Sequence, residues 1–145
     1  MLKLCSNENL DEPNKFYCKN CAVPTKSTKK LRLYRLPKIL ILHLKRFTND
    51  NSKLCKLDNV IGINGDLDFD KLKICHKNSL GSKLYNLFGI VNHFGSLESG
   101  HYTSECRSLY DNSWYNFNDS NYISCHSPEY VTSTSVYLLF YRRAN

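Results

Sequence analysis

Residues 89–107 read Gly-Ile-Val-Asn-His-Phe-Gly-Ser-Leu-Glu-Ser-Gly-His-Tyr-Thr-Ser-Glu-Cys-Arg, and residues 114–120 read Trp-Tyr-Asn-Phe-Asn-Asp-Ser. Apolar, β-prone residues precede His93, and polar and apolar residues alternate after Gly100, as in a strand. Residues 111–113 are Asp, Asn and Ser, which favour a turn. We therefore predict an antiparallel hairpin between the strand after Gly100 and the strand that begins at Trp114.

The register of this hairpin decides which side chains meet. A hairpin symmetric about Leu109 and Tyr110 places His101 opposite Asn118, with Cβ atoms about 4.5–5.5 Å apart. A bulge would shift the register by one residue and bring Asp119 there instead. An imidazole held by an amide or a carboxylate is the base of a nucleophilic site, because it deprotonates a Cys or Ser while its partner fixes the tautomer. The candidate catalytic residues are therefore His101 with Asn118 or Asp119.

Several linked motifs follow one another in the order of a known family. They are Tyr17-Cys18-x-x-Cys21, Lys26, Leu36-Pro37-x-Ile39-Leu40-x-Leu42-x-Leu44-Lys45-Arg46-Phe47, His93-x-Gly95, Gly100-His101-Tyr102, Trp114-Tyr115-x-Phe117-Asn118-Asp119-Ser120 and Tyr137-Leu138-Leu139-Phe140-Tyr141-Arg142. Together they resemble the ubiquitin-specific proteases, from about residue 17 to residue 143.

The resemblance implies an α+β fold that is mainly antiparallel β, with the palm-like sheet of a papain-like cysteine peptidase and part of a finger region. We expect residues 1–145 to be a single partial domain. Residues of about 1–30 would form a finger-like segment with half a zinc site, and about 31–145 the palm with the histidine box.

The resemblance also assigns roles. It implies that His101 converts a Cys thiol to a thiolate and later protonates the leaving lysine amine, and that Asn118 orients the imidazole. Asp119 matches a second acidic position, which would polarise water or the oxyanion region. The remaining matched positions are substrate-binding in this reading: His93 on the turn before Gly95, Gly95 and Gly100 for close backbone approach, and Tyr102. For the two glycines the alternative is that an ordinary turn requires glycine there, without any contact with substrate.

The nucleophile of the family lies in a Gly-Asn-x-Cys box that precedes these motifs. None of the seven cysteines is in that context, namely Cys5, Cys18, Cys21, Cys55, Cys75, Cys106 and Cys125. We therefore expect the C-terminal half of a deubiquitinase that cleaves at the ubiquitin C-terminus, inactive alone and partnered by the N-terminal half and by ubiquitin conjugates. The alternative is a catalytically inactive ubiquitin-binding or scaffold fragment.

Cys18 and Cys21 lie on a tight turn and could point two thiolates at one metal. A structural zinc site needs four ligands, usually two such pairs, and the resemblance places the second pair in a finger segment further upstream. An empty or collapsed half-site is the alternative. Zinc is thus a possible structural ligand, whereas the expected catalysis requires no cofactor.

A basic region runs from Lys26 to Lys56, with ten Lys or Arg residues and one acid, Asp50, in a chain of net charge +7. A basic zinc-ribbon nucleic-acid binder is therefore the third hypothesis. The basic residues alternate with apolar ones over 31–36, and no reading helix or stacking pair accompanies them. We favour a solvated strand face and expect no nucleic-acid partner.

The composition, with 41% hydrophobic and 12% aromatic residues in 145, predicts a packed core. No segment reads as a signal peptide or reaches the roughly 18 apolar residues of a membrane span. We expect no membrane association, a cytoplasmic or nuclear location and reduced thiols.

Elsewhere the pattern predicts further elements. The apolar run 39–44 indicates a strand buried on both faces, with His43 as a hydrogen-bonded core histidine. Residues 136–141 predict a buried strand that closes the sheet. Residues 48–82 are expected to form loops around short strands or one short helix near 70–76, and 122–132 read as a loop.

Overall fold

In the computed structural model of the chain, the strand that most others depend on is β10 (Leu84–Gly95), the longest of those described. Along one edge it pairs with β9 (Asp66–Asp68) near its start and with β11 (Gly100–Arg107) over its second half, and along the other edge it pairs with β15 (Val136–Arg143). All three pairings are antiparallel. The structure describes residues 7–50, 53–125 and 130–145, and these fall into two compact units, 1–36 with 69–81 and 37–68 with 82–145.

The first unit is made of short hairpins. Its elements are β1 (Asn7–Leu10), β2 (Phe16–Cys18), β3 (Val23–Thr25), β4 (Ser27–Lys30) and α1 (Phe69–Leu72). β1 pairs with β4 and β2 with β3, both antiparallel. The predicted helix is confirmed, although it is one turn long. The predicted strand over 31–36 is wrong, because β4 ends at Lys30 and only an isolated parallel bridge joins Leu33 to Cys75.

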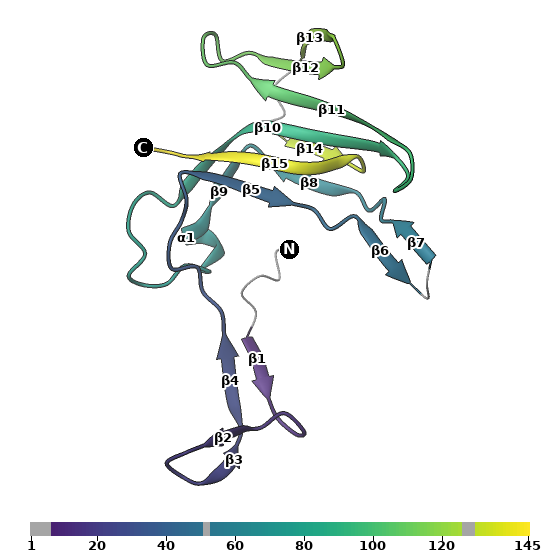
Figure 1. Ribbon diagram of the computed structural model, residues 1–145. Helices are drawn as coiled ribbons and strands as arrows, with labels where there is room; N and C mark the ends of the chain where they lie inside the picture. Colours follow the sequence, from purple (N-terminus) through teal and green to yellow (C-terminus); the bar gives the residue numbers. More distant parts are fainter. Residues whose placement is uncertain (1–6, 51–52, 126–129) are drawn as a thin grey trace. The chain divides into compact units, whose positions relative to one another are not determined.

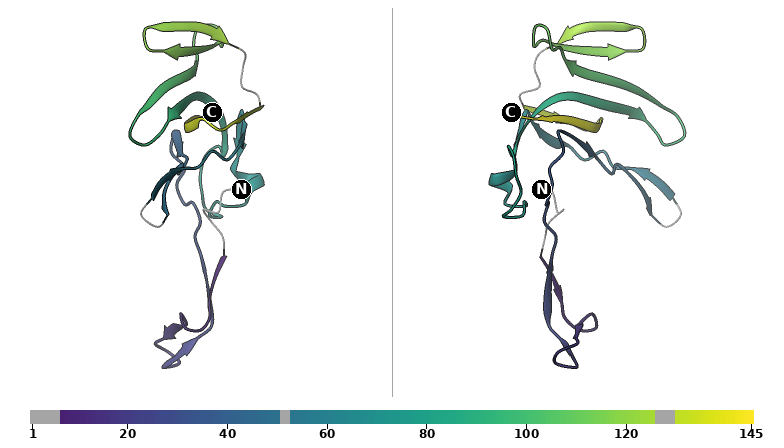
Figure 2. Two further views of the ribbon diagram at one scale, coloured as in Figure 1. Left: turned by 90° about the vertical axis from the view of Figure 1, so that its right-hand side faces the viewer. Right: turned by 60° about the vertical axis from the view of Figure 1, so that its left-hand side comes forward.

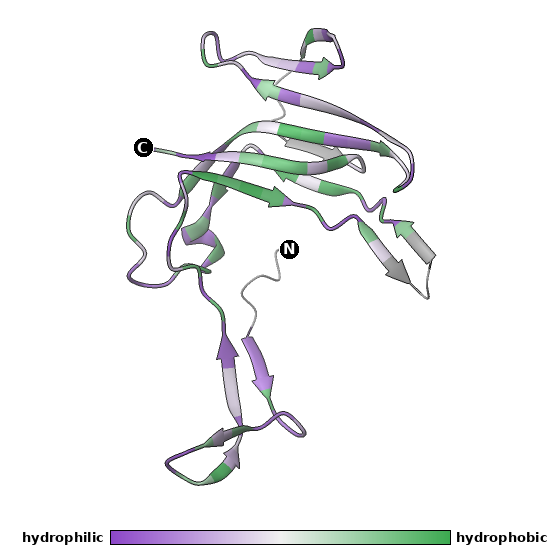
Figure 3. Cartoon of the chain, in the orientation of Figure 1, coloured by the Kyte–Doolittle hydropathy of each residue, from purple (hydrophilic) through white to green (hydrophobic). Residues whose placement is uncertain are grey.

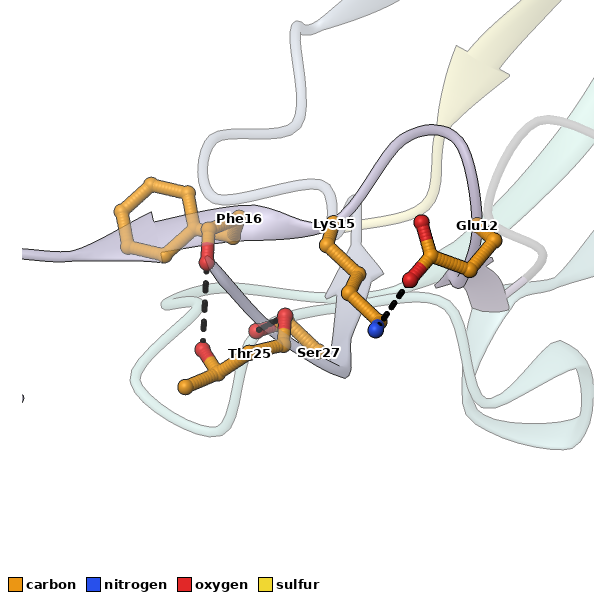
Figure 4. A network of polar contacts seen from close by, with 5 residues as sticks. All are labelled: Glu12, Lys15, Phe16, Thr25 and Ser27. Carbon is orange, nitrogen blue, oxygen red and sulfur yellow. Dashed lines mark hydrogen bonds and ion pairs between the residues drawn. The ribbon is translucent and has the colours of Figure 1, made fainter. Parts of the chain in front are cut away.

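Polar contacts fix the base of the β2–β3 hairpin (Figure 4). The Thr25 hydroxyl donates to the Phe16 carbonyl at 3.1 Å, and the Ser27 hydroxyl to the Thr25 carbonyl at 3.4 Å. Lys15 and Glu12, three residues apart in the preceding loop, form an ion pair. They lie at the base of the hairpin that carries Cys18 at the end of β2 and Cys21 in the following turn.

The second unit contains a seven-stranded sheet in the order β13-β12-β11-β10-β15-β5, with β9 also on β10 (Figure 1). Three more strands of this sheet are β5 (Ile39–His43), β12 (Trp114–Asn118) and β13 (Asn121–Cys125). The unit also contains β6 (Phe47–Asp50), β7 (Lys53–Lys56), β8 (Ile61–Asn64) and β14 (Tyr130–Ser133). β6 pairs with β7 and β8 with β14 as separate two-stranded sheets. Figure 2 shows the succession from the β12–β13 hairpin through β11 and β10 to β15 from two other directions.

The core of this unit lies where β10 meets β15. Tyr85 and Ile90 of β10 and Tyr141 and Val136 of β15 are almost completely buried. Hydrophobic residues accordingly concentrate on β5, β10 and β15, whereas β1 and β4 are mostly hydrophilic (Figure 3). The Tyr141 hydroxyl donates to the Asn64 carbonyl at 2.8 Å, so that this buried phenol is satisfied. Burial, with a smaller effect of Asp66, raises the pKa of Tyr141 to about 12.

Three sequence predictions are corrected here. β5 is an edge strand, not one buried on both faces, because β15 is the only described strand that pairs with it and Ile39 and Ile41 remain 42% and 54% exposed. His43 is exposed and packs against the Tyr137 ring in a T-shaped arrangement instead of lying in the core. β15 is buried as predicted, but it lies inside the sheet and does not close it.

Residues 122–132 also differ from the prediction of a loop, because β13 and β14 occupy both ends of that stretch. Its middle, residues 126–129, lies outside the described residues. None of the helices that the structure describes has the length and hydrophobicity of a bilayer span.

A buried arginine joins distant parts of this unit. Arg46 is 4% exposed, and its guanidinium donates four hydrogen bonds to main-chain carbonyls. Nε bonds Val136 at 2.7 Å, Nη1 bonds Leu57 at 2.9 Å and Asn59 at 2.8 Å, and Nη2 bonds Ser133 at 3.2 Å. One planar cation thus connects the segment after β7 to the turn between β14 and β15.

We expect Arg46→Lys to lower the free energy of unfolding by about 3 kcal/mol, because an ammonium cannot reach all four carbonyls and leaves some of them buried without a donor. Urea denaturation of the 145-residue chain measures this. The matched control is Arg107→Lys, on exposed Arg107 of β11, which should change stability by less than about 0.5 kcal/mol. Equal denaturation midpoints for the two variants would contradict a bridging role for Arg46.

Candidate functional site

His101 and Asn118 meet on neighbouring strands of the sheet. His101 is the second residue of β11 and Asn118 the last residue of β12. The imidazole Nε2 lies 2.6 Å from the Asn118 Oδ1, a short hydrogen bond between two exposed side chains. The predicted contact between this histidine and this amide is therefore confirmed.

The register that produces the contact differs from the predicted one. Ser104 faces Phe117 and Arg107 faces Trp114, so the hairpin is centred one residue later than Leu109–Tyr110. Every pairing is thereby shifted by two, and His101 lies diagonally from Asn118, not directly opposite. Because side chains alternate with a period of two, a shift of two keeps both residues on one face, and diagonal neighbours remain within reach of long side chains.

The turn after β12 separates Asn118 from Asp119. Asn118 pairs with Asn121, so that Asp119 and Ser120 form a two-residue hairpin loop, and Asp119 has a positive φ of 51°. Asp and Asn tolerate this left-handed conformation better than other non-glycine residues. The structure therefore brings Asn118, not Asp119, onto His101. The proposed second acidic role of Asp119 stays a prediction.

The hydrogen bond selects a tautomer of His101. With the amide oxygen as acceptor, the ring carries its proton on Nε2 and leaves the Nδ1 lone pair as the basic atom. A neutral amide fixes this orientation without adding charge. The pair can therefore act as an oriented general base toward a group that approaches Nδ1.

His93 lies within β10, not on the turn that precedes Gly95, and it is only 4% exposed. Its ring lies 4.7 Å from the ring of Tyr102, its cross-strand partner, and 5.5 Å from that of Phe47, measured between centroids. Its Nδ1 is buried, and in the described part of the chain this atom has no hydrogen-bond partner. Burial, and to a lesser degree the positive charge of Lys56, lowers the pKa of His93, which keeps the ring neutral.

Gly100 is required by the packing of His93. A Cβ atom at this position would lie 2.1 Å from Nε2 of His93 and 2.8 Å from the Phe94 carbonyl oxygen. No side chain fits there unless the imidazole moves. For this glycine the observed constraint is close approach of a neighbouring ring, and contact with a substrate stays a prediction.

Gly95 is required by its backbone conformation. Its φ is +96°, and a Cβ atom would lie 2.5 Å from the carbonyl oxygen of Ser99. The turn requirement considered as an alternative for this residue is therefore present. Tyr102, by contrast, is 55% exposed beside the buried His93. A substrate could therefore reach the Tyr102 side chain, and the predicted contact stays a prediction.

Two basic residues near the site were treated as surface charge in the sequence analysis and were missed. Lys56 donates from Nζ to the carbonyls of His93 at 2.9 Å and Gly95 at 3.1 Å, and Arg46 is the buried bridge described above. A signal existed for Arg46, because it shares strand parity with Leu40, Leu42 and Leu44 after the apolar run. No comparable pattern distinguished Lys56.

Two of the described cysteines, Cys106 of β11 and Cys125 of β13, do not have the properties of a reactive nucleophile. Burial raises the pKa of the Cys106 and Cys125 thiols, which is opposite to what a reactive thiolate needs. The six cysteines described are free thiols, as predicted.

Cys18 and Cys21 form one half of a possible metal site. The amide groups of Cys21 and Asn20 and the Cys21 thiol lower the pKa of Cys18, which favours the thiolate that binds metal. A tetrahedral zinc site needs four ligands, and within residues 7–50, 53–125 and 130–145 no group of three or more potential ligands gathers. Among the described residues, Cys18 and Cys21 thus fit two of the four positions and do not by themselves make a complete site.

The sequence has clear relatives. Residues 5–141 match the family described as ubiquitin carboxyl-terminal hydrolase. Ubiquitin carboxyl-terminal hydrolase 5 of Arabidopsis thaliana is 41% identical over 129 residues, which are 88% of this chain and 14% of that protein. Ubiquitin carboxyl-terminal hydrolase 15 of Homo sapiens is 37% identical over 139 residues, 95% of this chain and 14% of that protein. The chain therefore spans only about a seventh of these relatives.

Solved structures show the same fold. The SAGA DUB module bound to monoubiquitin contains a chain with a TM-score of 0.81 and 32% identity, covering 97% of this chain and 31% of that one. The module bound to ubiquitin aldehyde gives 0.79 at 31% identity, covering 97% and 32%. The predicted class, a mainly antiparallel α+β fragment of the papain-like peptidase type, is confirmed.

We expect Gly100→Ala to cost about 2 kcal/mol of stability, because the added methyl group overlaps the His93 imidazole and forces it to move. Urea denaturation measures the cost, and the ring resonances of His93 report the displacement. Gly89→Ala is the control in β10, where a Cβ meets Phe140 at an ordinary 3.4 Å. An unchanged His93 environment in Gly100→Ala would contradict this role of the glycine.

The lowered pKa of His93 predicts a pH dependence of stability. The unfolded chain binds a proton on this residue near pH 6.5, whereas the folded chain binds it only at lower pH. The stabilisation is therefore complete above about pH 6.5 and is lost as the pH falls through the lowered folded value. We expect the loss of stability between pH 7.5 and pH 5 to be smaller in His93→Phe. His43→Gln, which removes an exposed imidazole, should keep the wild-type slope; identical slopes in all three proteins would refute the assignment.

Proposed function

The chain belongs to the ubiquitin carboxyl-terminal hydrolase family, and from this we propose that it supplies the general base of a cysteine peptidase that hydrolyses bonds at the C-terminus of ubiquitin. The observation that carries the proposal is the 2.6 Å contact between His101 Nε2 and Asn118 Oδ1. The nucleophilic thiol is contributed by polypeptide outside this sequence, in the N-terminal half of the same catalytic domain.

The reaction follows from the orientation of the ring. His101 takes the thiol proton at Nδ1, and the thiolate attacks the carbonyl carbon of the isopeptide or peptide bond. As the C–N bond breaks, the imidazolium returns this proton to the leaving lysine amine. A water molecule then gives a proton to His101 while its oxygen attacks the thioester, which releases the ubiquitin carboxylate and restores the thiol.

The other matched residues complete the proposed site. Asn118 holds the imidazole through its amide oxygen, and Asp119, on the adjoining turn, polarises water or the oxyanion region. Tyr102, with its exposed ring, and the backbone near Gly95 and Gly100 receive the C-terminal tail of ubiquitin. His93 supports this end of the strand, because its ring is buried against Tyr102 and Gly100.

Ubiquitin and its conjugates are the proposed partners, since two of the similar solved chains belong to modules bound to monoubiquitin or to ubiquitin aldehyde. Cytoplasm or nucleus is the proposed location. For Cys18 and Cys21 we propose two thiolate ligands of a structural zinc ion, with the other two ligands from outside this sequence. The proposed catalysis itself uses no cofactor.

We expect the chain mixed with the N-terminal half to cleave a fluorogenic ubiquitin C-terminal amide, and the chain alone to be inactive. His101→Ala should lower kcat about a thousandfold, and Asn118→Ala about tenfold to a hundredfold, because the ring then loses its fixed tautomer. Asn118→Asp should retain activity, since a carboxylate can accept the same hydrogen bond.

His43→Gln is the control for loss of an imidazole and should leave kcat unchanged. Cleavage by the isolated chain would place a nucleophile within it and overturn the proposal. Ubiquitin binding by the mixture without any cleavage would instead support the inactive scaffold.

A further inference from the structure

Lys56 forms hydrogen bonds to the C-terminal end of β10, the strand that leads into the proposed site. It is the last residue of β7, and its ammonium donates to the carbonyl oxygens of His93 at 2.9 Å and Gly95 at 3.1 Å. These are the third-last and the last residues of β10. One flexible side chain from another hairpin therefore fixes two carbonyls at the point where β10 ends.

The fixed residues are coupled to His101 through the β10–β11 ladder. Gly95 pairs with Gly100 and Phe94 pairs with His101, so the position of the Gly95 backbone sets where β11 begins. The four-residue loop between them is exposed and held by its own bonds, among them Ser96 N–H to the Ser99 carbonyl at 2.8 Å. Lys56 supplies an additional contact from outside this hairpin.

The hairpin that carries Lys56 is itself held in place. Phe47 and Lys56 are directly paired across β6 and β7 and share one face, where the Phe47 ring lies 5.5 Å from the His93 ring. At the base of the same hairpin the Leu57 amide donates to the Arg46 carbonyl, and the Arg46 guanidinium donates to the Leu57 carbonyl. The ammonium of Lys56 thus comes from a position that buried Arg46 defines.

We propose that Lys56 is a positioning residue that holds the end of β10 and thereby places His101 at the distance and angle from Asn118 that the reaction needs. This inference rests on the proposed function. Charge-assisted hydrogen bonds from an ammonium to carbonyls are roughly twice as strong as neutral ones, so Lys56 adds a restraint beyond the hydrogen bonds within the loop. Besides burial, which is the larger cause, the same positive charge disfavours protonation of His93.

The test compares Lys56→Met, Lys56→Arg and Lys38→Met. Methionine keeps the length of the stem but cannot donate, whereas a guanidinium can bond both carbonyls. Lys38→Met removes an exposed lysine from the same unit and is the matched control. If Lys56→Met fails to fold, Lys56→Gln takes its place with the same expectations.

In the 145-residue chain we expect amide exchange over residues 96–101 to rise about tenfold in Lys56→Met and to remain near wild type in Lys56→Arg and Lys38→Met. In the mixture with the N-terminal half, Lys56→Met should lower kcat about tenfold to a hundredfold with little change in KM, because a small misplacement of a catalytic group affects the chemical step. Lys56→Arg should restore most of kcat.

Amide exchange and kcat within twofold of wild type in Lys56→Met would overturn the inference, and so would equal losses of kcat in Lys56→Met and Lys56→Arg. If the wild-type mixture cleaves no ubiquitin substrate, the proposed function fails. The amide exchange of the chain then still decides whether Lys56 fixes the turn.

Discussion

The guanidinium of Arg46 is a buried charge whose hydrogen bonds end on the main-chain carbonyls of four residues: Leu57, Asn59, Ser133 and Val136. Removing a cation from water is costly, and the cost is offset only when each donor finds an acceptor with good geometry. The bond to the Val136 carbonyl is buried and the other three are part-buried, so the cation and the loops stabilise one another. The position of the β6–β7 hairpin follows from this arrangement.

The proposed site depends on the β6–β7 hairpin, whose base Arg46 holds in place. The hairpin brings Phe47 against the ring of His93 and Lys56 against the carbonyls of His93 and Gly95. His93 in turn occupies the space that a side chain at Gly100 would need. His101 follows Gly100 directly. Its exposed ring therefore belongs to a strand end that packs against the His93 ring and lies beside the carbonyls bonded by Lys56.

The sequence allowed the strands of this region and the partners of the site to be predicted, because two-residue periodicity and turn residues are local signals. The His101–Asn118 contact was predicted although the register was wrong by two, since parity alone puts both side chains on one face. The edge position of β5 was not predictable, because an apolar run does not say how many strands pair with it. Lys56 was missed because its partners are main-chain carbonyls. Every residue has such a carbonyl, so no residue type in the sequence indicates the contact.

The charges around the site lead to one further step. Lys56 and burial keep His93 neutral, and the partner of His101 is a neutral amide, so neither His93 nor Asn118 holds a permanent charge against the His101 ring. In the proposed reaction a thiol approaches Nδ1 and gives its proton to the ring, and the thiolate that forms is the charge that stabilises the imidazolium. The hydrogen bond to Asn118 thus orients the ring of the proposed site before the nucleophile arrives.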